Sequence, residues 1–179
     1  LGALGAPIAG RLAAAHPTTV WNRTGLRADE FLRHHTATKA PTPKEAATGA
    51  DVVLTCLPTS AEVEALLEAP DGSLAGLRPG TLLLDGTSGD PATSRRIARR
   101  LAEEGVAFAD TPVSGGPPAA ASGALTVMVG GDEAVFARAR PVLETFGKRI
   151  EHVGPVGSGH ALKSVNNALL AVNILLMYF

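Results

Sequence analysis

The chain has 179 residues, 45% of them hydrophobic and 18% charged, so it carries enough apolar material for a folded domain and is not a disordered segment. The 16 Lys and Arg residues nearly balance the 17 Asp and Glu residues, which disfavours a nucleic acid or an anionic membrane as partner. The single cysteine, Cys56, excludes an internal disulfide and a cysteine-rich zinc site, and the histidines lack metal-ligand spacing. We therefore expect a cytoplasmic protein with no metal site.

Hydrophobic periodicity alternates between helix and strand along the chain. In chain order it predicts a helix over 6–15, a strand over 18–21, a helix over 27–35, a buried strand over 51–57 that contains Cys56, a helix capped by Ser60, a buried strand over 80–85, a helix over 91–104 closed by Gly105, strands over 106–109 and 124–129, a helix over 133–146 and a strand over 149–153. This alternation predicts an α/β fold with a doubly wound, mostly parallel sheet.

Two glycines at the start of the chain have the spacing of a dinucleotide-binding loop. In the Gly-x-Gly-x-x-Gly fingerprint the backbone approaches a pyrophosphate that lies on a helix N-terminus. Gly2 and Gly5 match the second and third glycines, so we expect the first glycine and a first strand upstream of residue 1. A plain helix start is the alternative reading of this short pattern.

Asn22, Arg23 and Thr24 follow the second expected strand of such a fold, where NAD enzymes usually carry an acidic residue for the ribose 2′-hydroxyl. A carboxylate would repel a 2′-phosphate, whereas a guanidinium can pair with it. The segment therefore predicts NADP(H) as the preferred cofactor, with NAD(H) possible, and a polar turn after a strand is the alternative.

Longer motifs together resemble the β-hydroxyacid dehydrogenases, the family of 3-hydroxyisobutyrate dehydrogenase and tartronate semialdehyde reductase. The resemblance rests on residues 1–9, Trp21-Asn22-Arg23-Thr24, Leu57-Pro58, Asp85-Gly86-Thr87-Ser88, residues 110–116, residues 123–131 and residues 157–167, which include Gly157-Ser158-Gly159-His160-Ala161-Leu162-Lys163. It implies an NAD(P)-binding Rossmann-like domain over residues 1–156. It also implies that residues 157–179 begin an interdomain helix, which leads to an all-α domain absent from this chain.

The resemblance also implies roles for individual residues in cofactor binding. Gly2, Ala3 and Leu4 would hold the pyrophosphate, and Asn22, Arg23 and Thr24 the 2′ end. Leu57 and Pro58 would lie under the ribose and nicotinamide, and Ser88 on the nicotinamide side. Two departures concern this site: Ser88 stands where the family commonly has Thr, and the cofactor-site residue Glu62 stands where it commonly has Asn, so an amide donor is lost.

Lys163 matches the catalytic lysine of that family. A lysine whose pKa is lowered by partial burial and by a nearby nicotinamide cation can act as a general acid or base. Asn167 lies one helical turn later on the same face and can orient the lysine or the substrate. The hydroxyl of Ser114 and the backbone N–H groups of Gly115 and Gly116 can bind a substrate carboxylate.

The leading hypothesis is an NADP-preferring oxidoreductase that transfers a hydride between nicotinamide and a small β-hydroxyacid or its semialdehyde, with Lys163 as general acid/base. The resemblance implies a homodimer or higher homo-oligomer. An imine reductase is one alternative, although such enzymes generally lack lysine at position 163, and a non-catalytic dinucleotide-binding module is another. The apolar run over 168–179 is shorter than the roughly 20 residues that cross a bilayer, so we expect a buried helix whose partner lies outside this chain. We expect His160 as a polar residue at the start of the interdomain helix.

Overall fold

The structure, a computed structural model, describes residues 1–178. Its helices are α1 (Gly5–Ala15), α2 (Gly25–Leu32), α3 (Pro43–Ala47), α4 (Ser60–Glu68), α5 (Pro91–Glu103), α6 (Gly116–Ser122), α7 (Glu133–Leu143) and α8 (Ser158–Leu176), with a 3-10 turn η1 over Ser73–Gly76. Its strands are β1 (Thr19–Val20), β2 (Thr38–Lys39), β3 (Val52–Thr55), β4 (Leu82–Asp85), β5 (Ala107–Asp110), β6 (Val113–Ser114), β7 (Leu125–Gly130) and β8 (Gly147–Gly154).

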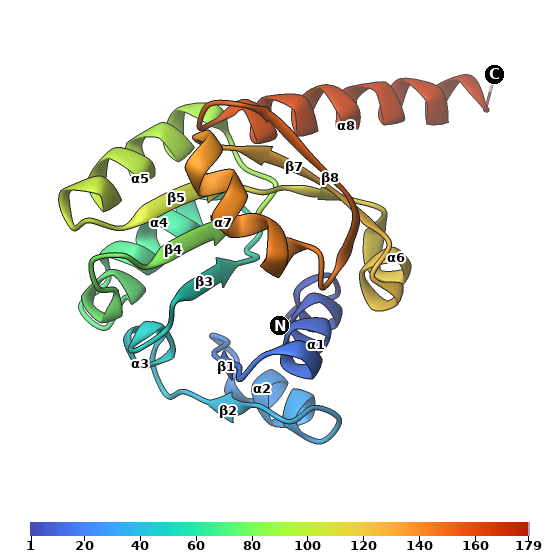
Figure 1. Cartoon of the computed structure of the whole chain (residues 1–179). Coiled ribbons are helices and arrows are strands. Elements are labelled where there is room, and N and C mark those ends of the chain that lie inside the picture. The colour runs from blue at the N-terminus through green and yellow to red at the C-terminus, as the bar shows by residue number, and fades with distance from the viewer. Residues whose placement is uncertain (179) are drawn as a thin grey trace.

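The main sheet has the strand order β3-β4-β5-β7-β6, and β8 pairs with β7. Strands β3, β4 and β5 run parallel, as do β7 and β8, whereas β7 is antiparallel to both β5 and β6. Strands β1 and β2 form a separate parallel pair, which lies beside α2 in Figure 1. The predicted α/β fold with a mostly parallel sheet is therefore confirmed.

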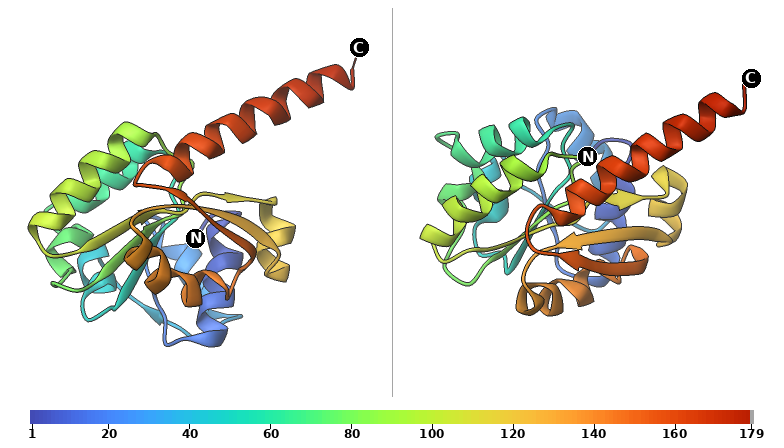
Figure 2. Two further views of the ribbon diagram at one scale, coloured as in Figure 1. Left: turned by 45° about the horizontal axis from the view of Figure 1, so that its top comes forward. Right: turned by 90° about the horizontal axis from the view of Figure 1, so that it is seen from above.

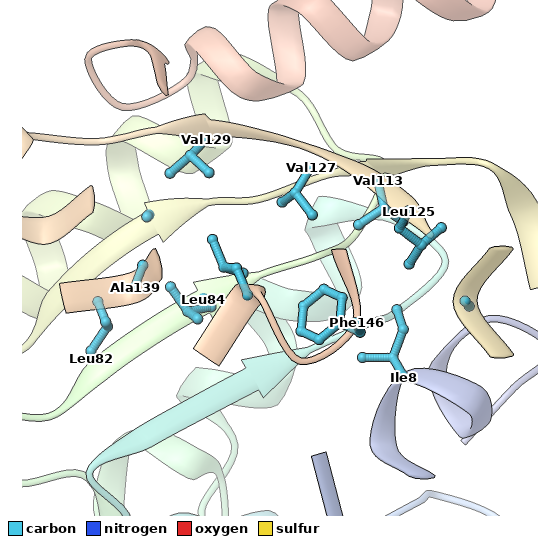
Figure 3. Packing of buried hydrophobic residues seen from close by; sticks show 12 residues of the cluster. Ile8, Leu82, Leu84, Val113, Leu125, Val127, Val129, Ala139 and Phe146 are labelled. Atoms are coloured by element: carbon cyan, nitrogen blue, oxygen red, sulfur yellow. The ribbon is translucent and has the colours of Figure 1, made fainter. Parts of the chain in front are cut away.

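Helices cover both faces of the main sheet. Alternate residues of a strand point to opposite faces, so Leu82 and Leu84 belong to one hydrophobic cluster and Leu83 to another. The first cluster joins the sheet to α1, α6 and α7, and Figure 3 shows its central side chains, among them Phe146 and Ile8. The second joins the sheet to α4 and α5. This three-layer packing supports the strand ends on which the candidate site is built.

Most expected elements are found, with three local corrections. The N-cap of α4 is Thr59 and not Ser60, because the Thr59 side chain accepts a hydrogen bond from the backbone N–H of Glu62. Cys56 follows β3 and is half-buried, so it does not lie inside a buried strand. His160 does lie in the first turn of a helix, as expected, but its side chain is fully buried.

Helix α8 begins against the sheet and then extends away from the rest of the chain (Figures 1 and 2). Its exposed apolar side chains include Leu162, Val165, Leu169, Leu170, Val172, Ile174, Leu175 and Leu176. The expectation that a partner outside this chain buries the apolar run stays a prediction. Across residues 1–178, none of the helices combines the length and apolarity needed to cross a membrane.

Candidate cofactor and active site

The candidate site follows the edge of the sheet where β3, β4 and β5 end. These three strands are parallel and in register, so their carboxyl ends meet at one edge, the edge at which open α/β sheets bind ligands. Leu57 and Pro58 follow β3, Ser88 follows β4, and Asp110 is the last residue of β5. Side chains that are far apart in the sequence are thereby brought to the same edge.

The first turn of α1 is a suitable site for an anionic group. The N-cap of α1 is Leu4, which makes no side-chain cap, and the first turn contains no acidic residue. The N–H groups at this end therefore lack a side-chain partner, and the helix dipole favours a negative charge beside them. A Cβ at Gly2 would meet only Nη1 of Arg27, at 3.9 Å. The loop thus leaves room for a diphosphate to approach its backbone.

One guanidinium group, that of Arg27, lies beside that loop, and Arg23 lies in the segment that precedes the helix carrying Arg27. Asn22, Arg23 and Thr24 connect β1 to α2, and Asn22 Nδ2 donates to the Thr24 carbonyl at 3.0 Å. Arg27 lies in the first turn of α2 and lines a hollow of about 360 Å³ together with Gly2. The sequence reasoning missed Arg27, although a second arginine four residues after Arg23 was the available signal.

Glu62 is engaged in capping α4. Its Oε2 accepts from the Thr59 backbone N–H at 3.1 Å, while its own N–H donates to the Thr59 hydroxyl at 3.4 Å. Its Oε1 lies 4.0 Å from Nη1 of Arg23, whose side chain is 86% exposed. An exposed pair at this distance is weak. The structure therefore brings the predicted residues Arg23 and Glu62 together, and it puts a carboxylate beside the guanidinium that is expected to bind the 2′-phosphate.

A buried polar network ties the loops after β3 and β4 together. The Thr87 hydroxyl accepts from the Leu57 backbone N–H at 3.1 Å, and the Thr87 N–H donates to Asp85 Oδ1 at 3.1 Å. The same carboxylate oxygen accepts from the Thr55 hydroxyl at 2.8 Å. Because buried polar groups are stable only when they are paired, this network fixes Leu57 relative to the residue that precedes Ser88.

Asp110 binds the start of α8. It is fully buried, and its two oxygens accept from the backbone N–H groups of Gly157 at 2.6 Å and His160 at 2.8 Å. Burial raises the pKa of the Asp110 carboxyl, and the two N–H groups act in the opposite direction. The carboxylate takes the place of an N-cap side chain for α8, a role that no local sequence pattern predicts.

Lys163 lies one turn into α8 and is half-buried. Burial lowers the pKa of its amino group below the ordinary value for lysine, as expected when the charged form loses hydration. Asn167 follows one turn later on the same side of the helix and is exposed. The pair thus has the spacing that the sequence predicts.

Ser114 lines a hollow of about 400 Å³ between α8 and strands β6 to β8. The helix contributes Leu162 and Asn166 to this hollow, which are the neighbours of Lys163 and Asn167 in the sequence, although that pair does not line it. The loop after Ser114 is exposed at Gly115 and Gly116, with φ values of +129° and +69°. Only glycine adopts such backbone angles readily, so the Gly-Gly pair permits the turn from β6 into α6.

Among the described residues, 1–178, no group of three or more His, Cys, Asp or Glu side chains is arranged to hold a metal ion.

Three related proteins indicate the class of the chain. It is 42% identical to the NAD-dependent L-serine dehydrogenase of Pseudomonas aeruginosa over 173 residues, which cover 96% of this chain and 58% of that protein. The solved structure of Mycobacterium tuberculosis 3-hydroxyisobutyrate dehydrogenase with L-serine superposes with a TM-score of 0.90 at 38% identity, over 96% of this chain and 58% of that one. The imine reductase of Myxococcus stipitatus in complex with NADP⁺ gives 0.87 at 26% identity, over 97% of this chain and 60% of that one.

The chain therefore spans less than two thirds of the length of these relatives. Residues 1–154 match the family described as the NAD binding domain of 6-phosphogluconate dehydrogenase. The match covers the whole α/β sheet and ends just before α8. It agrees with the glycine loop and the strand-end site, and the chain belongs to this family of NAD-binding domains.

Proposed function

We propose that the full-length protein is an NADP-preferring 3-hydroxyacid dehydrogenase or semialdehyde reductase, in which residues 1–156 bind the cofactor and residues 157–179 begin a helix leading to an all-α domain. The observation that carries this proposal is Lys163, a half-buried lysine with a lowered pKa on a helix bound to the ends of the cofactor-site strands. A lysine of this kind can give or take a proton near neutral pH more readily than an exposed one.

The cofactor part of the proposal is supported by the uncapped N-terminus of α1 and by Arg27, which lies beside Gly2. The backbone of Gly2, Ala3 and Leu4 would bind the diphosphate, and Arg23 and Arg27 would pair with a 2′-phosphate. The predicted contacts of Leu57, Pro58 and Ser88 stay part of the proposal. The bound nicotinamide supplies the hydride acceptor or donor.

The substrate part is supported by Ser114, which lines the hollow beside α8. The Ser114 hydroxyl and the N–H groups of Gly115 and Gly116 would hold a carboxylate. In the oxidative direction Lys163 would accept the proton of the substrate hydroxyl, and in the reductive direction it would donate a proton to the carbonyl oxygen. Asn167 would orient the substrate. L-Serine, named with two of the relatives, is a 3-hydroxyacid, so we infer a small substrate with a hydroxyl on the carbon β to a carboxylate. We also infer a homodimer or higher homo-oligomer.

Steady-state kinetics of the full-length protein test this function. NADP⁺ or NADPH would be supplied with a panel of 3-hydroxyacids and semialdehydes, for the wild type and for Lys163→Ala. Loss of a general acid/base should lower kcat on the order of 10²–10⁴-fold. Lys148→Ala, at an exposed lysine of β8, is the matched control and should leave turnover unchanged. Turnover of Lys163→Ala at the wild-type rate would exclude this mechanism.

The imine reductase alternative is kept because one of the relatives is such an enzyme. Lys163 argues against it, since the family resemblance implies that imine reductases generally lack this lysine. Cyclic imines in the same assay distinguish the two: reduction of imines with no turnover of hydroxyacids would favour the alternative.

A further inference from the structure

His160 joins the start of α8 to two other segments of the chain. It is fully buried, and its Nε2 lies 2.9 Å from the carbonyl oxygen of Thr87, the residue before Ser88. Its Nδ1 lies 2.7 Å from the hydroxyl oxygen of Ser94 in α5. A carbonyl oxygen can only accept, so Nε2 carries a proton and donates it to Thr87, while Nδ1 is paired with the Ser94 hydroxyl, which itself donates to the Asp90 carbonyl oxygen at 3.0 Å. Both ring nitrogens are therefore paired with groups outside α8.

Asp110 gives the same turn of helix a second anchor. Its carboxylate accepts from the backbone N–H groups of Gly157 and His160, so the residue whose ring contacts Thr87 is also bound through its main chain to the end of β5. The helix lies very close to the sheet here. A Cβ at Gly159 would stand 2.5 Å from the Met128 carbonyl oxygen, which real side chains do not tolerate. The first turn of α8 is thus held by side-chain, backbone and packing contacts together.

These contacts connect the parts that the proposed reaction has to align. Through Thr87 the His160 ring is connected to the loop of Ser88, and through Asp110 its main chain is connected to the strand that leads to Ser114. Lys163 follows His160 by three residues, and the Ser164 hydroxyl donates to the His160 carbonyl at 2.9 Å. A shift of His160 would therefore move Lys163 relative to both loops.

We propose that His160 and Asp110 are positioning residues that set the place of Lys163 relative to the Ser88 and Ser114 loops. The proposal rests on the proposed function, because it assigns Lys163 to the reaction. Both residues are fully buried, so they would act through the orientation of α8. Misplacement of a catalytic group by about 1 Å can cost about 10²-fold in rate, so fixed buried hydrogen bonds at this point have a kinetic consequence beyond stability.

The test compares variants of the full-length protein by kcat, KM, NADPH affinity and thermal midpoint. His160→Leu removes both ring hydrogen bonds and should lower kcat about 10- to 100-fold, while NADPH affinity is retained because the diphosphate loop belongs to α1. His160→Gln keeps an amide that can donate to the Thr87 carbonyl and should recover most of kcat. Asp110→Asn turns one acceptor into a donor facing an N–H group and should lower kcat in the same way as His160→Leu.

His152→Leu is the matched control. His152 Nε2 also contacts a backbone carbonyl, that of Gly131 at 2.6 Å, but the ring stacks on Phe136 of α7 and does not line the hollow beside Ser114. This variant should lose stability without loss of kcat. If His160→Leu keeps wild-type kcat, or if His160→Gln loses as much kcat as His160→Leu, the positioning role is wrong.

Hydrogen exchange separates this inference from the proposed function. In His160→Leu the amides of residues 158–164 and of the loop 86–90 should both lose protection, and in His152→Leu neither segment should change. Unchanged exchange in His160→Leu overturns the coupling, whatever the kinetics. If the wild type lacks turnover, or Lys163→Ala retains it, the proposed function fails, and loss of protection in both segments would then support the coupling alone.

Discussion

Under the proposed function, the charge around Arg23 would decide how the protein discriminates between NADPH and NADH. Arg23 is exposed and has one carboxylate, Glu62, at 4.0 Å. A 2′-phosphate at this guanidinium would be attracted by it and repelled by Glu62, and charges a few ångströms apart at a protein surface interact by about 1–4 kcal/mol. Arg27 adds a second cation near the same loop. Preference for NADP(H) should therefore depend on a balance between these three side chains.

Two substitutions should shift this balance in opposite directions. Arg23→Ala should weaken NADPH binding about tenfold and leave NADH binding nearly unchanged, because only NADPH carries the phosphate that a guanidinium pairs with. Glu62→Gln should strengthen NADPH binding by a few-fold, since the amide keeps the capping contact to Thr59 without the negative charge. Fluorescence titration of both cofactors measures the effect. Equal changes for NADPH and NADH in both variants would contradict binding of the 2′-phosphate here.

Among the elements, α5 begins at the same strand edge and shows how capping supports the site. Asp90 Oδ1 accepts from the N–H groups of Ala92 at 3.0 Å and Thr93 at 2.9 Å, and Pro91 occupies the first helical position. The Asp90 N–H donates to the buried hydroxyl of Ser60 at the start of α4. The two helices on this face are therefore connected at their N-termini, next to the Ser88 loop.

Loss of this cap should be visible as a pH-dependent loss of stability. Asp90→Ala should lower the free energy of unfolding by about 1 kcal/mol, measured by urea denaturation at neutral pH. Hydrogen bonds from Thr93 hold the pKa of Asp90 below its usual value. The stabilisation by the charge is therefore present above the unfolded pKa and is lost as the pH falls through the lower folded pKa. Asp90→Asn, a good uncharged cap, should stay stable near neutrality but lose this acid dependence. An Asp90→Ala variant as stable as wild type would contradict the cap.

The helices and strands also show which parts of the fold could be predicted from the sequence. The apolar run around Leu83 predicted a buried strand correctly, because burial on both faces leaves a continuous apolar pattern. The run around Leu54 also forms a strand, but Val52, Val53 and Leu54 are only half-buried because β3 lies at the edge of the sheet. Helix α6 was missed, because its first residues, Gly116-Pro117-Pro118, have the composition of a turn. The choice of Ser60 as N-cap was wrong by one residue. Thr59 and Ser60 both carry a hydroxyl group, and only the hydrogen bonds in the structure distinguish them.

For the candidate site, motif spacing and the family resemblance predicted which residues bind cofactor and substrate, and these roles stay predictions; neither predicted the hydrogen bonds that hold the loops. The glycine loop, the Ser88 loop and the Lys163–Asn167 pair could be found because each has a local pattern. The bonds from Asp110 to Gly157 and His160 join residues about fifty positions apart, and no local pattern predicts such a pairing. Arg27 had a local signal, a second arginine four residues after Arg23, but its approach to Gly2 depends on how α2 packs against α1.

On the scale of the whole molecule, one hydrophobic cluster joins the sheet to α1, the helix proposed to bind the cofactor diphosphate. Helix α1, which carries the glycine loop, is held to the turn between α7 and β8 by a hydrogen bond from Arg11 Nε to the Thr145 carbonyl at 3.0 Å. The next residue, Phe146, is 1% exposed and lies in the same cluster as Ile8 of α1 (Figure 3). The orientation of the glycine loop therefore depends on a side chain that is distant in sequence from it.

Phe146→Ala should reduce stability and NADPH affinity together. Truncation of a buried phenylalanine costs about 3–5 kcal/mol of stability, and loss of the contact beside Ile8 should also weaken NADPH binding, because α1 is no longer held in one orientation. Phe108→Ala is the matched control: Phe108 is 4% exposed, but it packs with α4 and α5 on the other face of the sheet. It should destabilise the protein similarly while the folded variant keeps its affinity for NADPH. Urea denaturation measures the loss of stability. NADPH titration, carried out where each variant is still folded, measures the loss of affinity. If both variants lose equal affinity, binding follows global stability and the Phe146 contact with α1 has no separate role.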